Sequence, residues 1–577
     1  MVKHGRMSLF SAVAILGVIA FLAPPGATAQ VLYGSIVGQV SDTSGAGTPG
    51  ATITITNRDT GLTRTAVSNE TGGYSFTNVQ PGPYDVKVTL QGFREFVKTG
   101  VPVSVNEVGR VDAALEVGTL TDTVTVASDL QLLQTDKADT HTEFKSAAIT
   151  QLPLPQNRNY QSLINLVPGA TPAAMQNSEV DTPGRALTTN VNGLDRNNNG
   201  TKTDGATNVN IWLPHHTMLV SPAETVDTVN VSTSNFDAEQ GMAGGAAITV
   251  ITKSGTNNFR GSAFAFYNNE KLNAMPFYAT EKAPSSSHID GATLGGPIQR
   301  NRMFFFGAWE GQYQTTPQQF FYNVPPAALR LGDFSKALNP DGSLQVIYDP
   351  QTGNPDGTGR LPFPGNVIPP GQLSAIALKL QTLYPNANLP GSSSGGNVGG
   401  AGFTRNFQRS LPRKFDRNNY DFKMNWNPSS AAQVWGKYSR MGANVKALFP
   451  YLPYDDRGNG DTTVNMYTFG STWTLNSTTV LDATYGISKM NHATVAGDFS
   501  FGNYGSDILG IPGMNGGRNF SSDPRYAGIP LVTTSSSFDS LGNGDGWDPV
   551  QRDERSEERR VGKECRTVCR SRWSPYH

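Results

Sequence analysis

Histidine and cysteine are common catalytic and metal-binding side chains, and both are sparse in this chain. Its 577 residues include seven His and two Cys. The histidines occur in neither the H-x-x-E nor the H-E-x-x-H spacing of zinc peptidases. Cys565 and Cys569 form a C-x3-C pair with no third or fourth ligand nearby, which is too little for a zinc site. The sequence therefore predicts no catalytic residue, no metal site and no cofactor.

One acidic loop partly matches a calcium-binding pattern. Asp195-Arg196-Asn197-Asn198-Asn199-Gly200 has the opening of such a loop. The bidentate Glu would stand six positions after Gly200, where the chain has Ala206. Without that ligand we expect a polar connecting loop rather than a calcium site.

Composition points to an exported protein made mostly of strands and turns. Lys and Arg total 45 against 46 Asp and Glu, and charged residues make up 16% of the chain, so no basic face for nucleic acid is expected. Glycine and proline are abundant, at 62 and 37 residues, without the period of three that collagen requires. The length predicts several domains.

The N-terminus has the pattern of an export signal, which we place at residues 1–29. Lys3 and Arg6 precede an apolar run over residues 9–23, and Ala27-Thr28-Ala29 is a cleavage sequence, so cleavage is expected between Ala29 and Gln30. No later segment has 18 consecutive apolar residues, so any membrane crossing would have to use a β-barrel.

Residues 555–577 differ from the rest of the chain. They contain seven Lys or Arg, three Glu and both cysteines. This segment resembles the translation of a common sequencing-library adapter, and we expect it to be a non-native tail. The alternative is a genuine basic tail.

Residues 30–118 are predicted to form a small β-sandwich. In the segment 51–56 Ile and Thr alternate, as in a half-buried strand, and Gly-rich turns separate several such segments. Tyr74, Phe76 and Tyr84 stand at alternate strand positions, which favours the core over a sugar-stacking surface. Gly38-Gln39-Val40, Thr71-Gly72-Gly73-Tyr74-Ser75-Phe76 and Pro81-Gly82-Pro83-Tyr84-Asp85-Val86 resemble the carboxypeptidase regulatory-like domain, a transthyretin-like sandwich also classed with carbohydrate-binding-like folds.

Residues 119–255 follow the order of a receptor plug. Thr203-Asp204-Gly205-Ala206 precedes a strand, and the small residues Gly244-Gly245-Ala246-Ala247 lead into a strand that ends Thr252-Lys253-Ser254-Gly255. Both patterns resemble the plug of TonB-dependent outer-membrane receptors. We expect the small residues to let the plug backbone approach a surrounding barrel wall closely.

The resemblance also suggests where energy coupling would occur. Asp122, Thr123, Val124, Thr125 and Val126 form a short alternating segment where such receptors can carry the box that binds a periplasmic TonB-type protein by strand addition. The alternatives are an ordinary linker strand and the first strand of the plug.

Residues 256–554 are predicted to be part of an outer-membrane barrel. Segments of about ten residues alternate apolar and polar positions and carry aromatic residues, as in 259–267, 303–313, 420–426, 467–473 and 481–488. Apolar faces would contact lipid and polar faces the lumen; a soluble sandwich would alternate in the same way. The stretches 325–410 and 449–460 read as long extracellular loops. Segments within 295–390, among them Phe363-Pro364-Gly365-Asn366-Val367-Ile368-Pro369, resemble the Oar-like branch of these receptors.

About seven strands are too few to close a plugged barrel, which has about 22. We therefore expect an all-β-dominated chain with a sandwich, an α+β plug and the first part of a truncated transmembrane barrel. The resemblance implies a non-enzymatic receptor in the outer membrane, in contact with lipid, that takes up a scarce glycan, peptide or metal chelate with a TonB-type partner and binds no nucleic acid. The alternatives are a non-transporting surface adhesion or carbohydrate-binding barrel and a secreted carbohydrate-binding or peptidase accessory protein.

Overall fold

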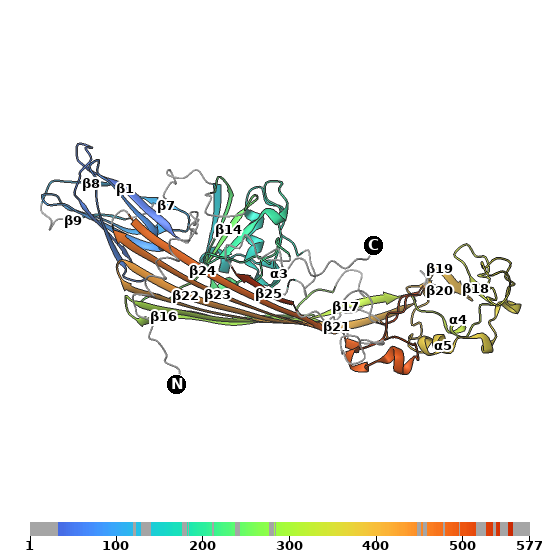
Figure 1. Cartoon of the computed structure of the whole chain (residues 1–577). Coiled ribbons are helices and arrows are strands. Elements are labelled where there is room, and N and C mark those ends of the chain that lie inside the picture. Colours follow the sequence, from blue (N-terminus) through green and yellow to red (C-terminus); the bar gives the residue numbers. More distant parts are fainter. Residues whose placement is uncertain are drawn as a thin grey trace, which may run out of the picture.

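A computed structural model shows three parts along the chain: a small sandwich, a plug and a long twisted sheet (Figure 1). It describes residues 33–118, 123–127, 140–175, 182, 184–210, 213–236, 243–275, 282, 284–446, 452–453, 458–476, 479–495, 497–514, 527–534, 538–542 and 552–557. The predicted signal with its cleavage position Ala29/Gln30 lies outside these residues, as does the predicted tail from residue 558 onward. In the described part, no helix has the length and apolarity to span a membrane.

The sandwich is built from two sheets that enclose one core. One sheet has the order β3-β2-β5-β6-β9, and in the other β1 pairs with β4, β7 and β8. The strands are β1 Gly34–Asp42, β2 Thr52–Asn57, β3 Thr63–Val67, β4 Gly73–Val79, β5 Gly82–Thr89, β6 Glu95–Val103, β7 Val108–Arg110, β8 Ala113–Leu115 and β9 Thr123–Ala127. Ile53 and Ile55 are fully buried while Thr54 between them is not, as the alternation predicts.

The three aromatic residues of the sandwich lie in its core. Tyr74, Phe76 and Tyr84 are all buried, and the Tyr74 hydroxyl donates to the carbonyl of Val111 at 2.6 Å. Burial raises the pKa of the Tyr84 hydroxyl to about 12. The sugar-stacking reading of these rings is therefore wrong, because none of them presents a face to solvent.

The plug contains a five-stranded sheet of order β10-β13-β14-β11-β12. Its elements are β10 Thr140–Lys145, α2 Ser146–Gln151, α3 Pro155–Arg158, the 3-10 helices η1 Tyr160–Leu166, η2 Arg196–Asn198 and η3 Ala223–Thr225, β11 Gly200–Thr203, β12 Ala206–Thr207, β13 Val226–Ser234 and β14 Ala247–Thr252. Every residue of β14 is buried, because other plug segments cover one face and the long sheet covers the other. η1 ends just before Pro168-Gly169.

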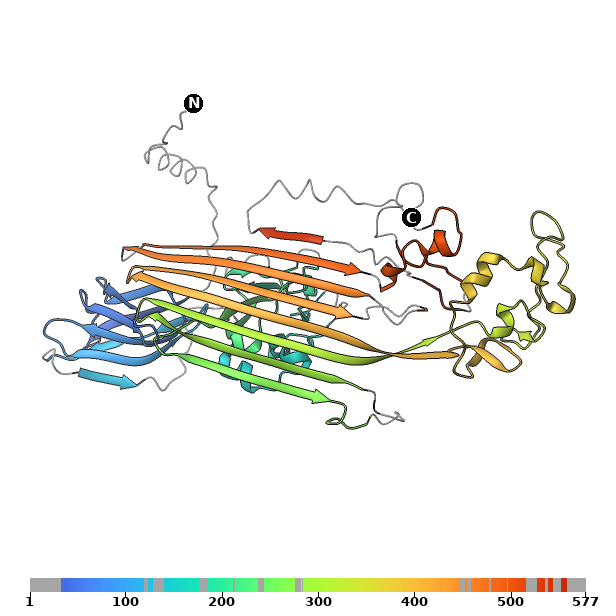
Figure 2. The same ribbon diagram turned by 90° about the horizontal axis from the view of Figure 1, so that it is seen from below.

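The long sheet, called the barrel sheet below, has eight antiparallel strands in the order β15-β16-β17-β21-β22-β23-β24-β25. They are β15 Arg260–Asn269, β16 Ser286–Gln299, β17 Met303–Tyr322, β21 Phe407–Ser429, β22 Ala432–Lys446, β23 Asn459–Asn476, β24 Thr479–Val495 and β25 Arg552–Glu557. Within the described strands β15 and β25 do not pair, so the sheet is open (Figure 2). Sequence analysis did not predict β16, which carries three glycines and in which apolar and polar residues alternate poorly.

The two faces of the barrel sheet differ as the alternation predicts. Tyr420, Phe422 and Trp426 point outward and are about half exposed, whereas Asp421 and Lys423 between them are buried against the plug. The same alternation recurs along β23 and β24, where Phe469 and Leu481 are exposed. A lipid-facing apolar surface and a polar inner surface are the features of an outer-membrane barrel wall.

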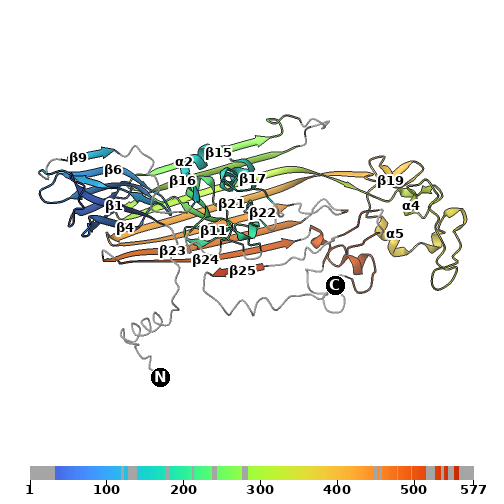
Figure 3. The same ribbon diagram turned by 90° about the horizontal axis from the view of Figure 1, so that it is seen from above.

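The two ends of the barrel sheet also differ. At one end the strands are joined by short turns, such as 300–302 and 430–431, and the sandwich lies there (Figure 3). At the other end the connections are long. Since short turns of such barrels face the periplasm and long loops face outward, the sandwich lies on the periplasmic side.

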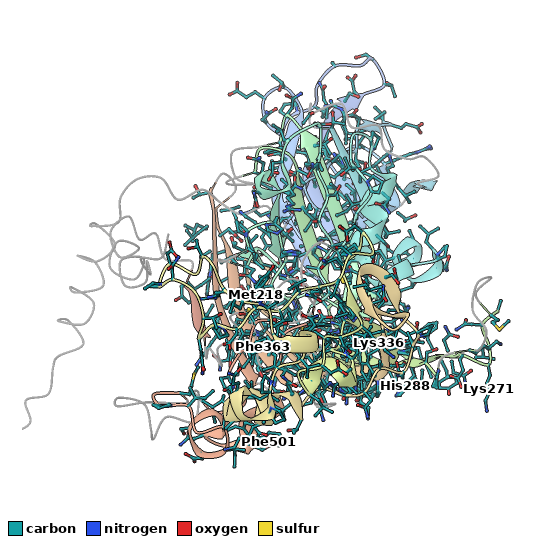
Figure 4. The ribbon with its side chains drawn as sticks, turned by 90° about the vertical axis from the view of Figure 1, so that its right-hand side faces the viewer. Met218, Lys271, His288, Lys336, Phe363 and Phe501 are labelled. Carbon is teal, nitrogen blue, oxygen red and sulfur yellow. The ribbon has the colours of Figure 1, made fainter. Side chains whose placement is uncertain are left out.

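The longest connection folds into structure of its own. It holds α4 Ala327–Arg330, β18 Ala337–Leu338, η5 Pro364–Asn366, η6 Pro370–Gln372, α5 Ala375–Gln381, β19 Ser392–Val398 and β20 Ala401–Thr404, and η7 Gly497–Phe501 and η8 Tyr504–Ile508 follow β24. Leu329, Ala337 and Phe403 form a small core within it. The expected loop 325–410 is thus partly wrong at its end, because residues 407–410 already belong to β21. In Figure 4, Lys336 and Phe363 mark this module at the near end of the molecule.

Candidate functional site

The plug rests on the concave, polar face of the barrel sheet, and this contact is the candidate functional site. Part of it is apolar: Met218 and Leu219 of the plug pack against Met441, Val464 and Met490 of β22, β23 and β24. Met218 is labelled in Figure 4, where it lies over the inner face of the sheet. Methionine side chains adapt to irregular surfaces, so this cluster can stabilise the contact without demanding one geometry.

The centre of the contact is a buried carboxylate. Asp204 occupies the tight turn between β11 and β12, at φ 46°, followed by Gly205 at φ 81°. This left-handed pair explains the Asp-Gly sequence, since Asp tolerates and Gly readily adopts these angles. The turn directs the Asp204 side chain toward the barrel sheet.

Four donors surround the Asp204 carboxylate. The Nζ atoms of Lys423 and Lys437 lie 3.0 Å from its two oxygens, and the hydroxyl and backbone N–H of Thr252 donate to it at 2.6 and 3.1 Å. Burial raises the pKa of Asp204, but the two ammonium groups outweigh burial and hold that pKa well below its usual range. The carboxylate is therefore ionised and joins two barrel strands to the plug.

The lysines have further partners on the wall. Lys437 also lies 3.5 Å from Asp421, whose carboxylate accepts a hydrogen bond from Ser439. Lys423 also donates to the backbone carbonyl of Thr252. These buried charges form one network, in which removal of a single member leaves its neighbours with fewer partners in a buried environment.

Arginine side chains make a second set of contacts between plug and wall. Arg417 of β21 donates to the carbonyl of Gly184 at 3.0 Å, and Arg185 of the plug donates to Gln314 of β17 at 2.9 Å. The Arg185 guanidinium also lies 4.3 Å from the centre of the Phe415 ring. These bonds anchor the plug segment 184–185 to the inner face of the sheet.

Backbone approaches the wall at positions other than those predicted. A Cβ added to Gly486 of β24 would lie 2.5 Å from the Cβ of Ala206, so plug and wall are nearly in backbone contact there. In contrast, Gly245 faces Asn199 within the plug. For Gly244 and Gly245 the expected packing on the wall is therefore wrong, because these two small residues make room for a neighbouring plug loop.

A third contact joins all three parts of the molecule. Tyr33 and Val105 of the sandwich, Ile251 of the plug and Trp435 of β22 form one buried apolar cluster, called the three-way junction below. The hydroxyl of Thr472 on β23 donates to the Tyr33 hydroxyl at 2.8 Å. The sandwich is thus attached to both plug and wall.

The predicted coupling segment lies on the sandwich. Thr123–Ala127 forms β9, which pairs in parallel with β6 from Glu95 to Thr99; Asp122 is outside the described residues. β9 is the edge strand of its sheet, so one side of its backbone is unpaired with any described strand. The segment is not a strand of the plug sheet.

The calcium-like loop is a capped turn. The Asp195 side chain accepts from the backbone N–H of Asn197 at 2.9 Å, and Ala206 is buried in the neighbouring hairpin. Across the residues that the structure describes, no group of three or more His, Cys, Asp or Glu is placed to hold a metal.

The comparisons with known proteins agree with this architecture. The outer membrane beta barrel domain model matches residues 251–558, over half of the chain, and the carboxypeptidase regulatory-like domain model matches 35–116. The TonB-dependent transporter Oar of Myxococcus xanthus is 25% identical over 345 residues, covering 55% of this chain and 31% of that protein. The chain thus spans about a third of the length of this relative.

Solved structures with some likeness include outer-membrane receptors and transporters. The ferric enterobactin receptor of Pseudomonas aeruginosa aligns over 67% of this chain and 44% of its own, at 11% identity and a TM-score of 0.35. The transporter YddB of Escherichia coli aligns over 62% and 39%, at 10% identity and a TM-score of 0.37. Because the barrel-domain model covers more than half of the chain, including the whole barrel sheet, the chain belongs to the outer membrane β-barrel family and carries an N-terminal carboxypeptidase regulatory-like domain.

Proposed function

We propose that this chain is part of a receptor that binds a scarce solute at the cell surface and imports it with energy from a TonB-type periplasmic protein. The observation that carries the proposal is the buried contact of Asp204 with Lys423 and Lys437. A plug held to its wall by buried ion pairs cannot act as an open pore, because separating them exposes unpaired charges. A transport path past this plug therefore requires work from outside the barrel.

The periplasmic side is where such work can be applied. Thr123–Ala127 lies on that side with one backbone edge unpaired among described strands, which suits strand addition by a partner. This placement supports Asp122–Val126 as the coupling segment. The solute would be a glycan, a peptide or a metal chelate.

A deletion tests the coupling. Removal of residues 122–126 from the full gene product should abolish uptake while surface binding persists. The probes are labelled oligosaccharides, peptides and ferric chelates, supplied singly to cells that carry the protein. A matched control deletes five residues, 354–358, from a turn of the external module, which leaves the periplasmic side intact. Normal uptake after removal of residues 122–126 would contradict the proposed coupling.

A second candidate function is surface adhesion or carbohydrate binding without transport. The observation that favours it is the folded external module, in which Arg330 donates to the carbonyls of Pro325 and Tyr384 at 2.8 and 2.7 Å and holds two distant segments together. A preformed module of this kind can present a binding surface. Solute binding without accumulation inside the cell, whether or not 122–126 are present, would favour this alternative.

A further inference from the structure

A cavity of about 560 Å³ lies where the sandwich, the plug and the barrel sheet meet. Its lining includes Pro81 of the sandwich, Asp227 and Lys253 of the plug, and Phe306 and Asn425 of the barrel sheet. The volume falls within the range of about 300–1,000 Å³ found for small-molecule sites. Because sandwich loops line it, the cavity lies on the periplasmic side of the plug.

The lining combines apolar and polar side chains and carries both signs of charge. Asp227 and Glu224 contribute carboxylates, while Lys253 and Arg260 contribute cations. The Oδ1 atom of Asn425 is buried there and accepts no hydrogen bond from any described residue. A buried amide oxygen left in this way calls for water or a solute donor in the cavity. The chemistry suits a hydrophilic solute with amine and carboxylate or hydroxyl groups.

One side of the cavity is closed by the three-way junction. Tyr33 lines the cavity and is held by Trp435, Ile251 and the hydroxyl of Thr472. Next to it, the side-chain amide of Asn230 in the plug donates to the carbonyl of Val105 at 3.3 Å. These contacts hold the edge of the sandwich against the plug and the barrel sheet.

The opposite side is closed by a loop of the sandwich. The carbonyl of Asp59 accepts from the backbone N–H of Asn257 at 2.8 Å, and its carboxylate lies 3.6 Å from Arg260. A Cβ on Gly61 would meet the side chain of Asn301 in the short turn between β16 and β17, so this loop lies directly on the rim of the barrel sheet.

The contacts that close the two sides of the cavity are few in comparison with those in the core of the sandwich. The three-way junction has four buried apolar residues, whereas the sandwich core has seventeen. In the Asp59–Arg260 pair the Arg260 side chain is largely exposed and the Asp59 side chain partly so, so the pair contributes little. The sandwich can therefore separate from the rim as a rigid unit without unfolding.

We propose that this cavity is an exit vestibule for a hydrophilic solute and that the sandwich is its lid. The inference rests on the proposed function for the direction of transport, but closure of the cavity is independent of it. Solute that has passed the plug collects against Asn425 and the charged lining, and reaches the periplasm when the contacts at Tyr33 and Asp59 open.

Accessibility of the cavity tests the lid without any knowledge of the solute. Asn425→Cys places a thiol on the lining of the full gene product, in outer-membrane vesicles whose periplasmic face is accessible and in a background in which any other cysteine is replaced by Ser. The probe is a charged methanethiosulfonate reagent. Combining the reporter with Tyr33→Ala and Asp59→Ala should raise its labelling rate roughly tenfold or more.

A matched reporter controls for reagent and folding. Ser75→Cys lies on an exposed position of β4, and its rate should be the same with and without the lid substitutions. Equal rates for Asn425→Cys in closed and loosened proteins would overturn the lid. Unfolding of the sandwich would show as faster labelling of a buried position such as Ile53→Cys, and in that case Tyr33→Phe replaces Tyr33→Ala.

A disulfide addresses transport separately. Asp59→Cys with Asn257→Cys should close the lid on oxidation and stop uptake of whichever labelled probe is taken up, with recovery on reduction. Thr54→Cys with Thr65→Cys, which links β2 to β3 inside the sandwich, should have no effect. Full uptake with the lid locked overturns the vestibule, whereas uptake that is insensitive to deletion of 122–126 overturns only the proposed coupling.

Discussion

The plug and the sandwich are attached to the same barrel sheet by opposite kinds of contact. The plug is held by a buried carboxylate between two lysines, in addition to an apolar cluster and arginine bonds, whereas the sandwich is held by four apolar side chains and a few neutral hydrogen bonds without a buried ion pair among the described contacts. Buried charges resist separation because each unpaired ion is costly, while a small apolar contact can open and reclose at little cost. The molecule therefore has one attachment that needs work to open and one that thermal motion can open.

Breaking the charged attachment should have the largest effect. Asp204→Asn leaves Lys423 buried with a single remaining partner on the plug, and should destabilise plug docking by about 3–5 kcal/mol. Native-state hydrogen exchange of β14 amides in detergent micelles measures this loss. Replacing both lysines by Met in the Asp204→Asn protein should restore much of it. Unchanged exchange in the single variant would show that the network does not hold the plug.

Breaking the apolar attachment should have a smaller effect, confined to the sandwich. Trp435→Ala removes the side chain that the wall contributes to the three-way junction. It should weaken the attachment of the sandwich by about 2–3 kcal/mol, which is less than the cost of the same substitution in a fully buried core. Spin-label distances between sandwich and barrel sheet should broaden while the unfolding of the sandwich itself is unaltered. Tyr33→Phe, which removes the hydroxyl that interacts with Thr472, Trp435 and Asp482, should cost about 0.5–1.5 kcal/mol.

Trp473→Ala is the matched control for this variant. Trp473 lies on the neighbouring strand but points outward and is 43% exposed. Its loss should leave the spin-label distances as they are. Equal broadening for both tryptophan variants would mean that the barrel sheet, and not the junction, had been perturbed.

The smallest expected effect is on the pH dependence of plug stability, and it distinguishes two carboxylates of the plug. Burial raises the pKa of Asp227, so its charged form destabilises the plug at neutral pH and this penalty disappears as the pH falls through the raised pKa. Asp204 has a lowered pKa, so its contribution is complete above the ordinary Asp pKa of about 3.9 and is lost only in stronger acid. Asp227→Asn should stabilise the plug slightly at pH 7, by the exchange measurement used for Asp204.

Below neutral pH the gain from Asp227→Asn over the unmodified protein should shrink. A gain that stays constant from pH 7 to pH 4 would contradict the assignment of the penalty to the Asp227 charge. The Asp204→Asn protein should keep its deficit throughout the same range, which separates the two carboxylates.

Sequence patterns predicted the parts of this fold that follow a period. Ile53 and Ile55 in the sandwich and the outward Phe422 beside inward Lys423 follow from alternation of side chains along a strand. The pattern failed at β16, where glycines replace the apolar positions that would mark a strand. It also failed at residues 244–245, because small residues indicate a close neighbour without identifying it.

The ion-pair network lay beyond sequence reasoning for a different reason. Asp204 lies more than 200 positions before Lys423 and Lys437, and only the register of β21 against β22 places Lys423 and Lys437 opposite each other. The available signal was that both lysines stand at lumen-facing positions of their strands, where an isolated cation needs a partner. The coupling segment was predicted as a strand, but its pairing with β6 was not.

The pairing of β9 with β6 sets an order of mechanical events. β9 is joined to β6 by the backbone hydrogen bonds of a parallel pair, so traction on β9 is passed to the sandwich as long as those bonds hold. Any traction on Thr123–Ala127 thus reaches the sandwich first, and tension in the chain that continues to the plug builds only afterwards. The sandwich would therefore separate from the barrel sheet before the ion pairs of Asp204 with the wall break.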